Sequence, residues 1–170
     1  LELIAIAAKR EDGIVCVKSE GFPEDVVKPE DIAQPDETKF FTSGALIAGM
    51  EKAFLNNGLM IGGFDAYTIS SVLKGSGLSS SAAFEDMVGN ILSHFYNDGK
   101  VSSVKIAEIA KFAENVYYGK PCGLMDQTAS AVGNLVTIDF YDKDQPVITP
   151  VNFDFASCGH ALCIIDSGAD

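Results

Sequence analysis

The sequence predicts an α+β fold in which helices pack on a mixed sheet, and three observations favour it. Apolar runs bounded by turn residues occur near the start of the chain and again after residue 134, as expected for strands. Over residues 43–56 and again over 102–118, apolar residues recur at helical spacing. The order of these segments does not repeat a strand–helix–strand unit, which disfavours a doubly wound parallel sheet.

Composition limits the classes of protein that fit. The 170 residues suit one domain over residues 1–170, and 47% hydrophobic residues are ample for a core. A net charge of −12 argues against nucleic acid or an anionic membrane as the default partner, although it leaves a local phosphate site open. Four cysteines without a CxxC pair, two distant histidines and no signal-like segment predict a reducing, cytoplasmic setting without a metal cluster.

The first third of the chain predicts strands, an acidic connection and a helix. Residues 1–8 and 13–18 are apolar runs around the polar turn 9–12, which predicts an antiparallel hairpin. Residues 20–37 are acidic and contain three prolines, as in a loop or edge segment. Ser43 is placed to cap a helix that runs to about Asn56, with Gly58 beyond its end.

The remaining elements follow from periodicity and from helix breakers. Residues 61–73 predict a strand, and a glycine- and serine-rich loop then leads into a second helix that reaches about Tyr96. Ser102 or Ser103 begins a third helix that ends near Tyr118. Its predicted apolar face contains Ile106, Ile109, Ala110, Ala113 and Val116. A short helix over 126–132 and strands over 135–140, 147–151 and 161–165 complete the prediction.

The loop at residues 75–83, Gly-Ser-Gly-Leu-Ser-Ser-Ser-Ala-Ala, is the strongest candidate site. Its glycines allow a tight turn, its serines can cap a helix, and a helix N-terminus attracts phosphate. A plain small-residue turn with a serine cap explains the same residues. Because the loop contains no lysine, the Walker pattern is absent.

Two carboxylates form the second candidate feature. Asp126 follows a stretch with glycines and a proline, so it is either a reactive carboxylate at a helix start or simply an N-cap. Glu114 lies near the end of a helix, where a carboxylate opposes the macrodipole. It is therefore either solvated or compensated by a cation.

These two stretches together resemble the galactokinase family of the GHMP kinases. The loop resembles the family's phosphate-binding motif, and residues 121–127, Pro-Cys-Gly-Leu-Met-Asp-Gln, resemble its catalytic-aspartate segment. The resemblance covers residues 1–167 but only the middle of the family's length. It implies an α+β GHMP kinase N-terminal domain, related to the second domain of ribosomal protein S5.

The resemblance also implies a role for individual residues. Ser81 and Glu114 would share Mg²⁺, Asp126 would lie next to the sugar hydroxyl at C1, and Gly123 would help to bind the substrate. The residues that would wrap the ATP phosphates are Gly75, Ser76, Gly77, Leu78, Ser79, Ser80, Ser81 and Ala82. The implied activity is ATP-dependent phosphorylation of galactose or a similar sugar, with ATP and Mg²⁺ as cofactors.

Departures from the family pattern limit this expectation. Leu73-Lys74 stands where a proline usually introduces the loop. The family's first, sugar-binding motif and its glycine-rich C-terminal motif have no counterpart, and the only arginine is Arg10 in a predicted turn. We therefore expect the chain to be a piece of a longer protein and to be inactive alone.

Three other functions remain open at this level. A catalytically silent sensor of sugar and ATP would use the same fold, although keeping Ser81, Glu114 and Asp126 favours an enzyme. A GHMP kinase for mevalonate or homoserine is disfavoured by the amino-acid sequence of residues 122–127, which resembles that of galactokinases. An interaction domain without a nucleotide leaves both motifs unexplained.

Overall fold

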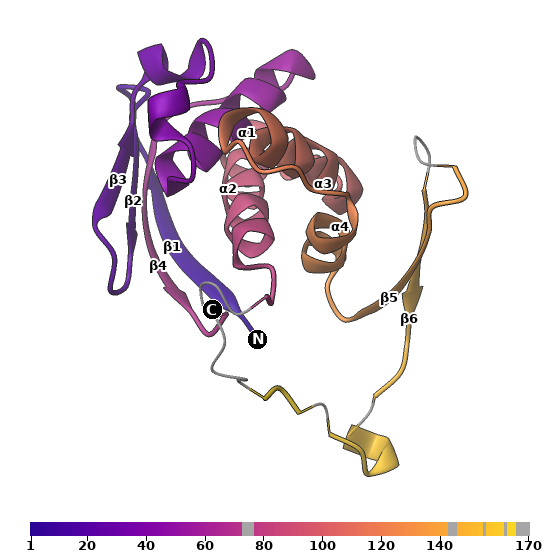
Figure 1. Ribbon diagram of the computed structural model, residues 1–170. Coiled ribbons are helices and arrows are strands. Elements are labelled where there is room, and N and C mark those ends of the chain that lie inside the picture. Colours follow the sequence, from indigo (N-terminus) through magenta and orange to yellow (C-terminus); the bar gives the residue numbers. More distant parts are fainter. Residues whose placement is uncertain (73–76, 143–145, 155, 162, 166–170) are drawn as a thin grey trace.

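The computed structural model describes residues 1–72, 77–142, 146–154, 156–161 and 163–165. A four-stranded sheet forms one layer, and the helices cover one of its faces (Figure 1). The strand order is β1-β4-β2-β3. The strands are β1 (Leu3–Lys9), β2 (Val15–Ser19), β3 (Glu24–Val27) and β4 (Phe64–Ser70).

The predicted hairpin between the first two strands is wrong, because β4 lies between them. β1 pairs antiparallel with β4, whereas β2 pairs parallel with β4 and antiparallel with β3. The connection between β1 and β2 crosses the start of β4 at Gly63, where a Cβ atom would lie 2.6 Å from the Ile14 carbonyl oxygen. The Arg10 guanidinium stabilises this crossing through ion pairs with the carboxylates of Asp12 and Asp65, with N–O distances of 2.6 and 2.7 Å. Only a glycine permits so close a backbone approach.

The acidic connection of residues 20–37 is an edge segment, as predicted. It contains the edge strand β3 and the short 3₁₀ helix η1 (Pro29–Ile32), and a second one, η2 (Glu37–Lys39), follows. The strand predicted over 61–73 is shorter, because β4 begins only after the glycine pair at 62–63. Residues 73–76 lie outside the described part of the chain.

The first helix has the predicted length with a different cap. α1 spans Ser43–Asn56, but the Thr42 hydroxyl, not that of Ser43, accepts the Ala45 N–H at 3.2 Å. The Ser43 hydroxyl instead donates to Asp25 at 2.5 Å and so ties the helix to β3. Gly58 follows the helix with φ +71, as its predicted place beyond the end requires.

The third helix changes its winding halfway. α3 (Ser103–Phe112), capped by Ser102, continues as the π-helix η3 (Ala113–Tyr117). The wider π turn rotates the following side chains, so Tyr117 is 3% exposed while the predicted core residue Val116 is 38% exposed. The Tyr117 hydroxyl then donates to the Ile32 carbonyl at 2.7 Å. The other helices are α2 (Ser80–Tyr96), α4 (Met125–Val132) and the 3₁₀ helix η4 (Ala156–Cys158).

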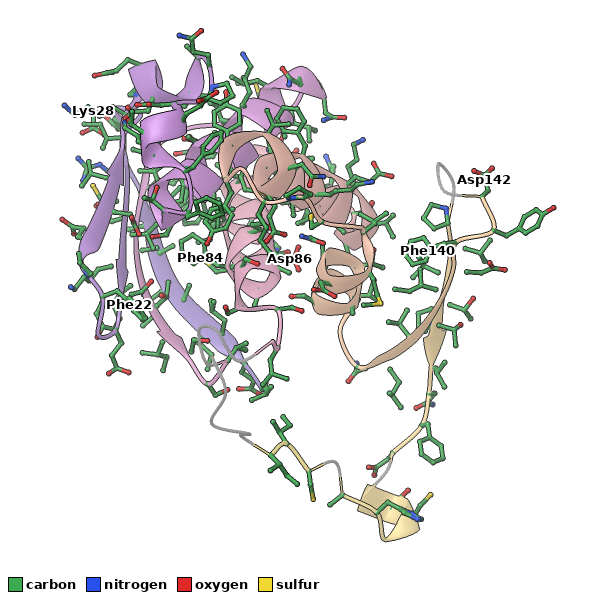
Figure 2. All side chains as sticks on the ribbon, in the orientation of Figure 1. Phe22, Lys28, Phe84, Asp86, Phe140 and Asp142 are labelled. Atoms are coloured by element: carbon green, nitrogen blue, oxygen red, sulfur yellow. The ribbon has the colours of Figure 1, made fainter. Side chains whose placement is uncertain are left out.

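The core fills the space between the sheet and α1, α2 and α3. Its large members include Phe54, Phe64, Ile47 and Leu92, all fully buried. Figure 2 shows Phe84 and Asp86 leaving opposite sides of α2, with Phe84 packed against the core. α2 therefore carries an apolar face toward the sheet and a polar face toward α4.

The C-terminal strands form a separate hairpin. β5 (Leu135–Asp139) pairs antiparallel with β6 (Val147–Val151) and extends beyond the helices in Figure 1. The strand predicted over 161–165 is wrong for the residues described there, 161 and 163–165, which adopt no regular structure. None of the helices in the described part of the chain is long and apolar enough to cross a membrane.

Candidate active site

Three turns of helix meet at one place and bring the predicted site residues together. The start of α2 carries Ser81, the π-helix η3 carries Glu114, and the start of α4 carries Asp126 and Gln127. The Ser81 hydroxyl donates to Glu114 Oε1 at 2.8 Å. This bond joins the two residues that the sequence assigned to one metal ion.

Glu114 is the centre of a hydrogen-bond network. Its side chain is 2% exposed. Lys120 Nζ lies 2.9 Å from the same oxygen that Ser81 contacts, and Gln127 Nε2 donates to Oε2 at 2.6 Å. The alternative of a solvated Glu114 is therefore wrong, and the alternative of a compensating cation is confirmed in Lys120.

Close packing of α1 holds the π turn in place. A Cβ atom on Gly49 would lie 2.8 Å from Ala113 Cα and Cβ and from Tyr117 Cβ. α1 therefore touches the backbone of η3, which a larger residue would prevent. Single π turns often occur at functional sites, and this one aims Glu114 at the start of α2.

Two buried carboxyl groups near one another carry different charges. Burial alone would raise the pKa of Glu114, but the bonds from Lys120 and Ser81 outweigh it, and the pKa is lowered. Burial, reinforced by the Glu114 charge, raises the pKa of Glu85 to about 9. Gln127 Nε2 reaches both, lying 3.4 Å from Glu85 Oε2. At neutral pH, Glu114 is therefore ionised and Glu85 is neutral.

The loop before α2 adopts a conformation that exposes backbone donors. Gly77 has φ +71, and Ser79 has the left-handed angles φ 60 and ψ 44 at the N-cap position. The Ser79 side chain makes no capping bond, so the predicted serine cap is wrong. The first N–H groups of α2 therefore have no side-chain cap, which suits an anionic ligand.

The other residues of the predicted phosphate-binding loop lie in different surroundings. Ser80 and Ala82 lie in the first turn of α2, and Ala82 is buried. Leu78 lines the large cavity next to this turn. Gly75 and Ser76, which the sequence assigned to phosphate binding, lie outside the described residues.

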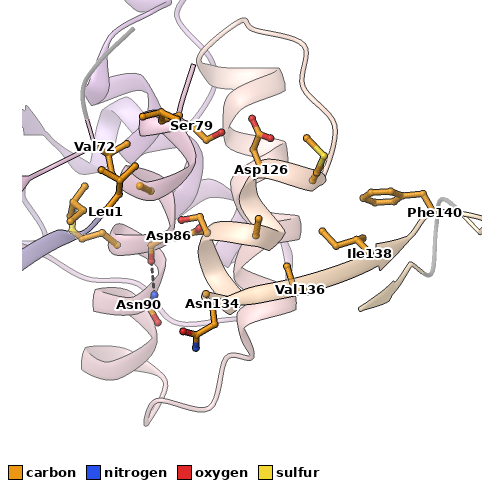
Figure 3. A pocket seen from close by; sticks show the side chains of 18 residues that line it. Leu1, Val72, Ser79, Asp86, Asn90, Asp126, Asn134, Val136, Ile138 and Phe140 are labelled. Atoms are coloured by element: carbon orange, nitrogen blue, oxygen red, sulfur yellow. Dashed lines mark hydrogen bonds between the residues drawn. The ribbon is translucent and has the colours of Figure 1, made fainter. Parts of the chain in front are cut away.

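Asp126 faces this cavity of about 850 Å³ and is exposed at its edge. Leu124 holds the N-cap position of α4, so the interpretation of Asp126 as a simple cap is wrong. In Figure 3, Ser79 and Asp126 lie near one another in the upper middle of the view, between Val72 on one side and Ile138 of β5 on the other. Gly123 is exposed, and nothing lies within 4 Å of the place where its Cβ would be.

Sequence reasoning missed four residues around this site. Lys120 and Gln127 bind Glu114, and Glu85 lies beside them. Asp86 lines the cavity with neither carboxyl oxygen hydrogen-bonded, and burial raises its pKa to about 7, offset in part by the Ser130 hydroxyl nearby. The available signal was weak: Lys120 and Gln127 flank the Asp126 segment, and two acids interrupt the apolar pattern of α2.

The structure defines an α+β domain in which the uncapped start of α2 suits an anionic ligand, and comparison places it in a family. The family model of the GHMP kinases N terminal domain matches residues 44–134, more than half of the chain. The chain belongs to this family. The predicted fold class is thereby confirmed.

The chain is also similar to particular proteins. It is 34% identical to the galactokinase of Streptomyces coelicolor over 171 residues, which cover 98% of the chain and 42% of that protein. It is 34% identical to the galactokinase of Clostridium tetani over 126 residues, 74% of the chain and 31% of that protein. The chain thus spans less than half the length of these relatives.

Solved structures agree with this placement. Lactococcus lactis galactokinase complexed with galactose superposes with a TM-score of 0.76 and 25% identity, over 91% of the chain and 40% of that protein. Methanococcus jannaschii mevalonate kinase superposes with a TM-score of 0.67 over 91% of the chain and 47% of that protein, at 14% identity. The second likeness shows a shared fold alone.

Proposed function

We propose that the protein transfers the γ-phosphoryl group of ATP to the C1 hydroxyl of galactose or a similar sugar. The observation that carries the proposal is the Ser81–Glu114 hydrogen bond of 2.8 Å beside the start of α4, where Gln127 binds Glu114 and the neighbouring Asp126 is exposed at the cavity edge. The relatives named galactokinase and the neighbour solved with galactose support this choice of substrate. The four free cysteines fit a cytoplasmic setting.

The start of α2 supplies the phosphate side of the reaction. Its backbone N–H groups and its dipole favour the negative charge of a triphosphate, and Gly77 and the left-handed Ser79 shape the approach. The remaining loop positions, Gly75 and Ser76, keep their proposed phosphate role from the sequence. No lysine side chain from this loop is needed, because dipoles and hydroxyls provide the contacts.

Asp126 supplies the acceptor side. As the C1 oxygen bonds to the γ-phosphorus, the bond from that phosphorus to the β–γ bridging oxygen breaks, and ADP leaves with the electron pair. The hydroxyl proton passes to the Asp126 carboxylate, which is exposed at the cavity edge. Gly123, with open space around it, leaves room for a sugar beside this carboxylate.

Mg²⁺ fits the residues at the start of α2. A hydroxyl and a carboxylate oxygen converge 2.8 Å apart, and both are hard ligands of the kind Mg²⁺ prefers. Ser81 and Glu114 would hold the ion. When bound, it would neutralise charge on the transferred phosphoryl group.

The test is sugar-dependent ADP release combined with calorimetric titration. We expect the purified protein to bind Mg·ATP and, in its full-length form, to release ADP only when a sugar such as galactose is present. Nucleotide binding without sugar-dependent release would favour a sensor. Absence of nucleotide binding in the full-length form would contradict the proposal.

A further inference from the structure

Lys120 and Glu114 form an unequal ion pair. The Lys120 side chain is 53% exposed, whereas that of Glu114 is 2% exposed. The ammonium can leave for water by rotation of its own side chain, but the carboxylate is held among buried groups. The ion pair can therefore separate by movement of the Lys120 side chain, while the Glu114 carboxylate stays in place.

The carboxylate is oriented so that one oxygen remains for a cation. Gln127 Nε2 holds Oε2 at 2.6 Å. The other oxygen, Oε1, faces both the Ser81 hydroxyl and the Lys120 ammonium, at 2.8 and 2.9 Å. A metal ion shared by Ser81 and Glu114 would use Oε1, which is where the ammonium lies.

A buried ionised carboxylate requires a positive partner. The neutral Gln127 amide and Ser81 hydroxyl give hydrogen bonds but no charge, and Glu85 nearby is acidic. Within the described ranges, the positive side chain that forms an ion pair with Glu114 is Lys120. Leaving such a group unpaired is strongly destabilising.

The backbone keeps Lys120 close even when its side chain moves. Its N–H donates to the Glu114 carbonyl at 3.0 Å. The preceding Gly119 has φ +79 and packs on Phe40, so closely that a Cβ there would lie 2.3 Å from the ring. The side chain can therefore exchange partners without rearrangement of the chain.

We propose that Lys120 is a resident counter-ion, which occupies the cation position beside Glu114 Oε1 and Ser81 until a divalent cation replaces it. The inference rests on the proposed function, because the ion arrives with the nucleotide. A divalent cation bound to this oxygen would repel the ammonium beside it, since like charges at this distance repel each other. When the divalent cation binds, its positive charge replaces that of the Lys120 ammonium. The Glu114 carboxylate therefore has a positive partner both before and after binding.

This role predicts effects of opposite sign. Removing the ammonium destabilises the protein without metal, because Glu114 loses its partner, and strengthens metal binding, because the competitor is gone. A purely structural lysine would give only the first effect. A lysine that binds phosphate would weaken nucleotide binding when it is removed.

The experiment is a Mn²⁺ titration of the purified protein, with free Mn²⁺ measured by electron paramagnetic resonance, alone and with a non-hydrolysable ATP analogue. The variants are Lys120→Met, Lys120→Arg and the matched control Lys105→Met, whose ion pair with Glu108 lies on exposed α3 surface. We expect Lys120→Met to lower the Mn²⁺ dissociation constant by roughly three- to thirty-fold, since it removes a competing occupied state. The melting temperature without metal should fall, and Lys105→Met should change neither quantity.

Failure of the inference differs from failure of the proposed function. Unchanged or weaker Mn²⁺ binding in Lys120→Met, with normal binding in the parent protein, overturns the counter-ion role alone. A parent protein that binds neither Mn²⁺ nor the ATP analogue overturns both. If Lys120→Met does not fold, Lys120→Gln gives the same comparison with a neutral hydrogen-bond donor in place of the ammonium.

Discussion

Ser81 and Glu114 lie 33 positions apart in the sequence, yet the Ser81 hydroxyl donates to Glu114 Oε1 at 2.8 Å. The bond connects the first turn of α2 to a π turn that continues α3. Neither residue is exposed enough for this contact to be a chance surface encounter, since Glu114 is buried and Ser81 is half-buried. The pair therefore joins the glycine- and serine-rich loop region to the π turn, and Gln127, which also binds Glu114, connects both to the start of α4.

Replacing Ser81 tests this connection. We expect Ser81→Ala to weaken Mg·ATP binding at least tenfold, because the variant lacks one of the two proposed protein ligands of the metal. The folded state should lose about 1.5–3 kcal/mol, the usual value of a hydrogen bond to a charged group. Calorimetric titration and urea unfolding measure the two effects. Ser103→Ala, an exposed serine in the first turn of α3, is the matched control, and equal nucleotide binding in both variants would contradict the assigned role.

Asp126→Ala separates chemistry from binding. Because Asp126 is exposed at the cavity edge, its removal should leave the melting temperature and ATP affinity nearly unchanged. Turnover in the full-length form should fall by roughly 100-fold or more, the usual contribution of a positioned acid or base. ADP release under saturating sugar is the measurement. Turnover near that of the parent protein would show that Asp126 is not the proton acceptor.

Gly49→Ala tests how packing supports the site. The added methyl would lie 2.8 Å from Ala113 and Tyr117, so α1 and the π turn must separate. We expect a loss of about 1–3 kcal/mol in the free energy of unfolding and weaker Mg·ATP binding, because Glu114 lies in that turn.

Gly44→Ala is the control in the same helix. A Cβ there would meet Asp25 and Val27 at ordinary distances of 3.7 and 3.8 Å. This variant should be neutral or slightly more stable, because alanine has the higher helix propensity. If both variants behave alike, close packing at Gly49 is not what holds the π turn.

Glu51 makes stability depend on pH. Its side chain is buried in α1 without a hydrogen-bond partner for either oxygen, and burial raises its pKa from 4.5 to about 8. Between these values the folded protein keeps a proton that the unfolded chain releases. Stability therefore falls as pH rises from about 4.5 to about 8 and changes no further above that range on account of this group.

Glu51→Gln removes this dependence. The variant should match the parent protein near pH 4.5 and exceed its free energy of unfolding by about 4 kcal/mol at pH 8, from the shift in pKa. Urea unfolding at the two pH values is the measurement. Glu108→Gln, on the exposed side of α3, should leave the pH dependence intact. A parallel shift of the Glu51→Gln curve at both pH values would show that Glu51 is ionised in the folded state.

Local sequence signals determined the elements and the candidate residues. The lengths of α1 and α2 follow from periodicity and breakers, which act within a few residues. Two motifs identified the family: the glycine- and serine-rich loop and the segment around Asp126. They could be recognised in the sequence because each is continuous in the chain. These features required no knowledge of which segments meet.

The tertiary structure decided everything that depends on distant partners. The place of β4 between β1 and β2 depends on the crossing at Gly63, and the inward turn of Tyr117 depends on a π bulge packed against Gly49. The charges around Glu114 depend on Lys120 and Gln127, which reach it only when the helices pack. Such contacts have no periodic signature, because their free energy comes from burial and packing between segments and not from local propensity.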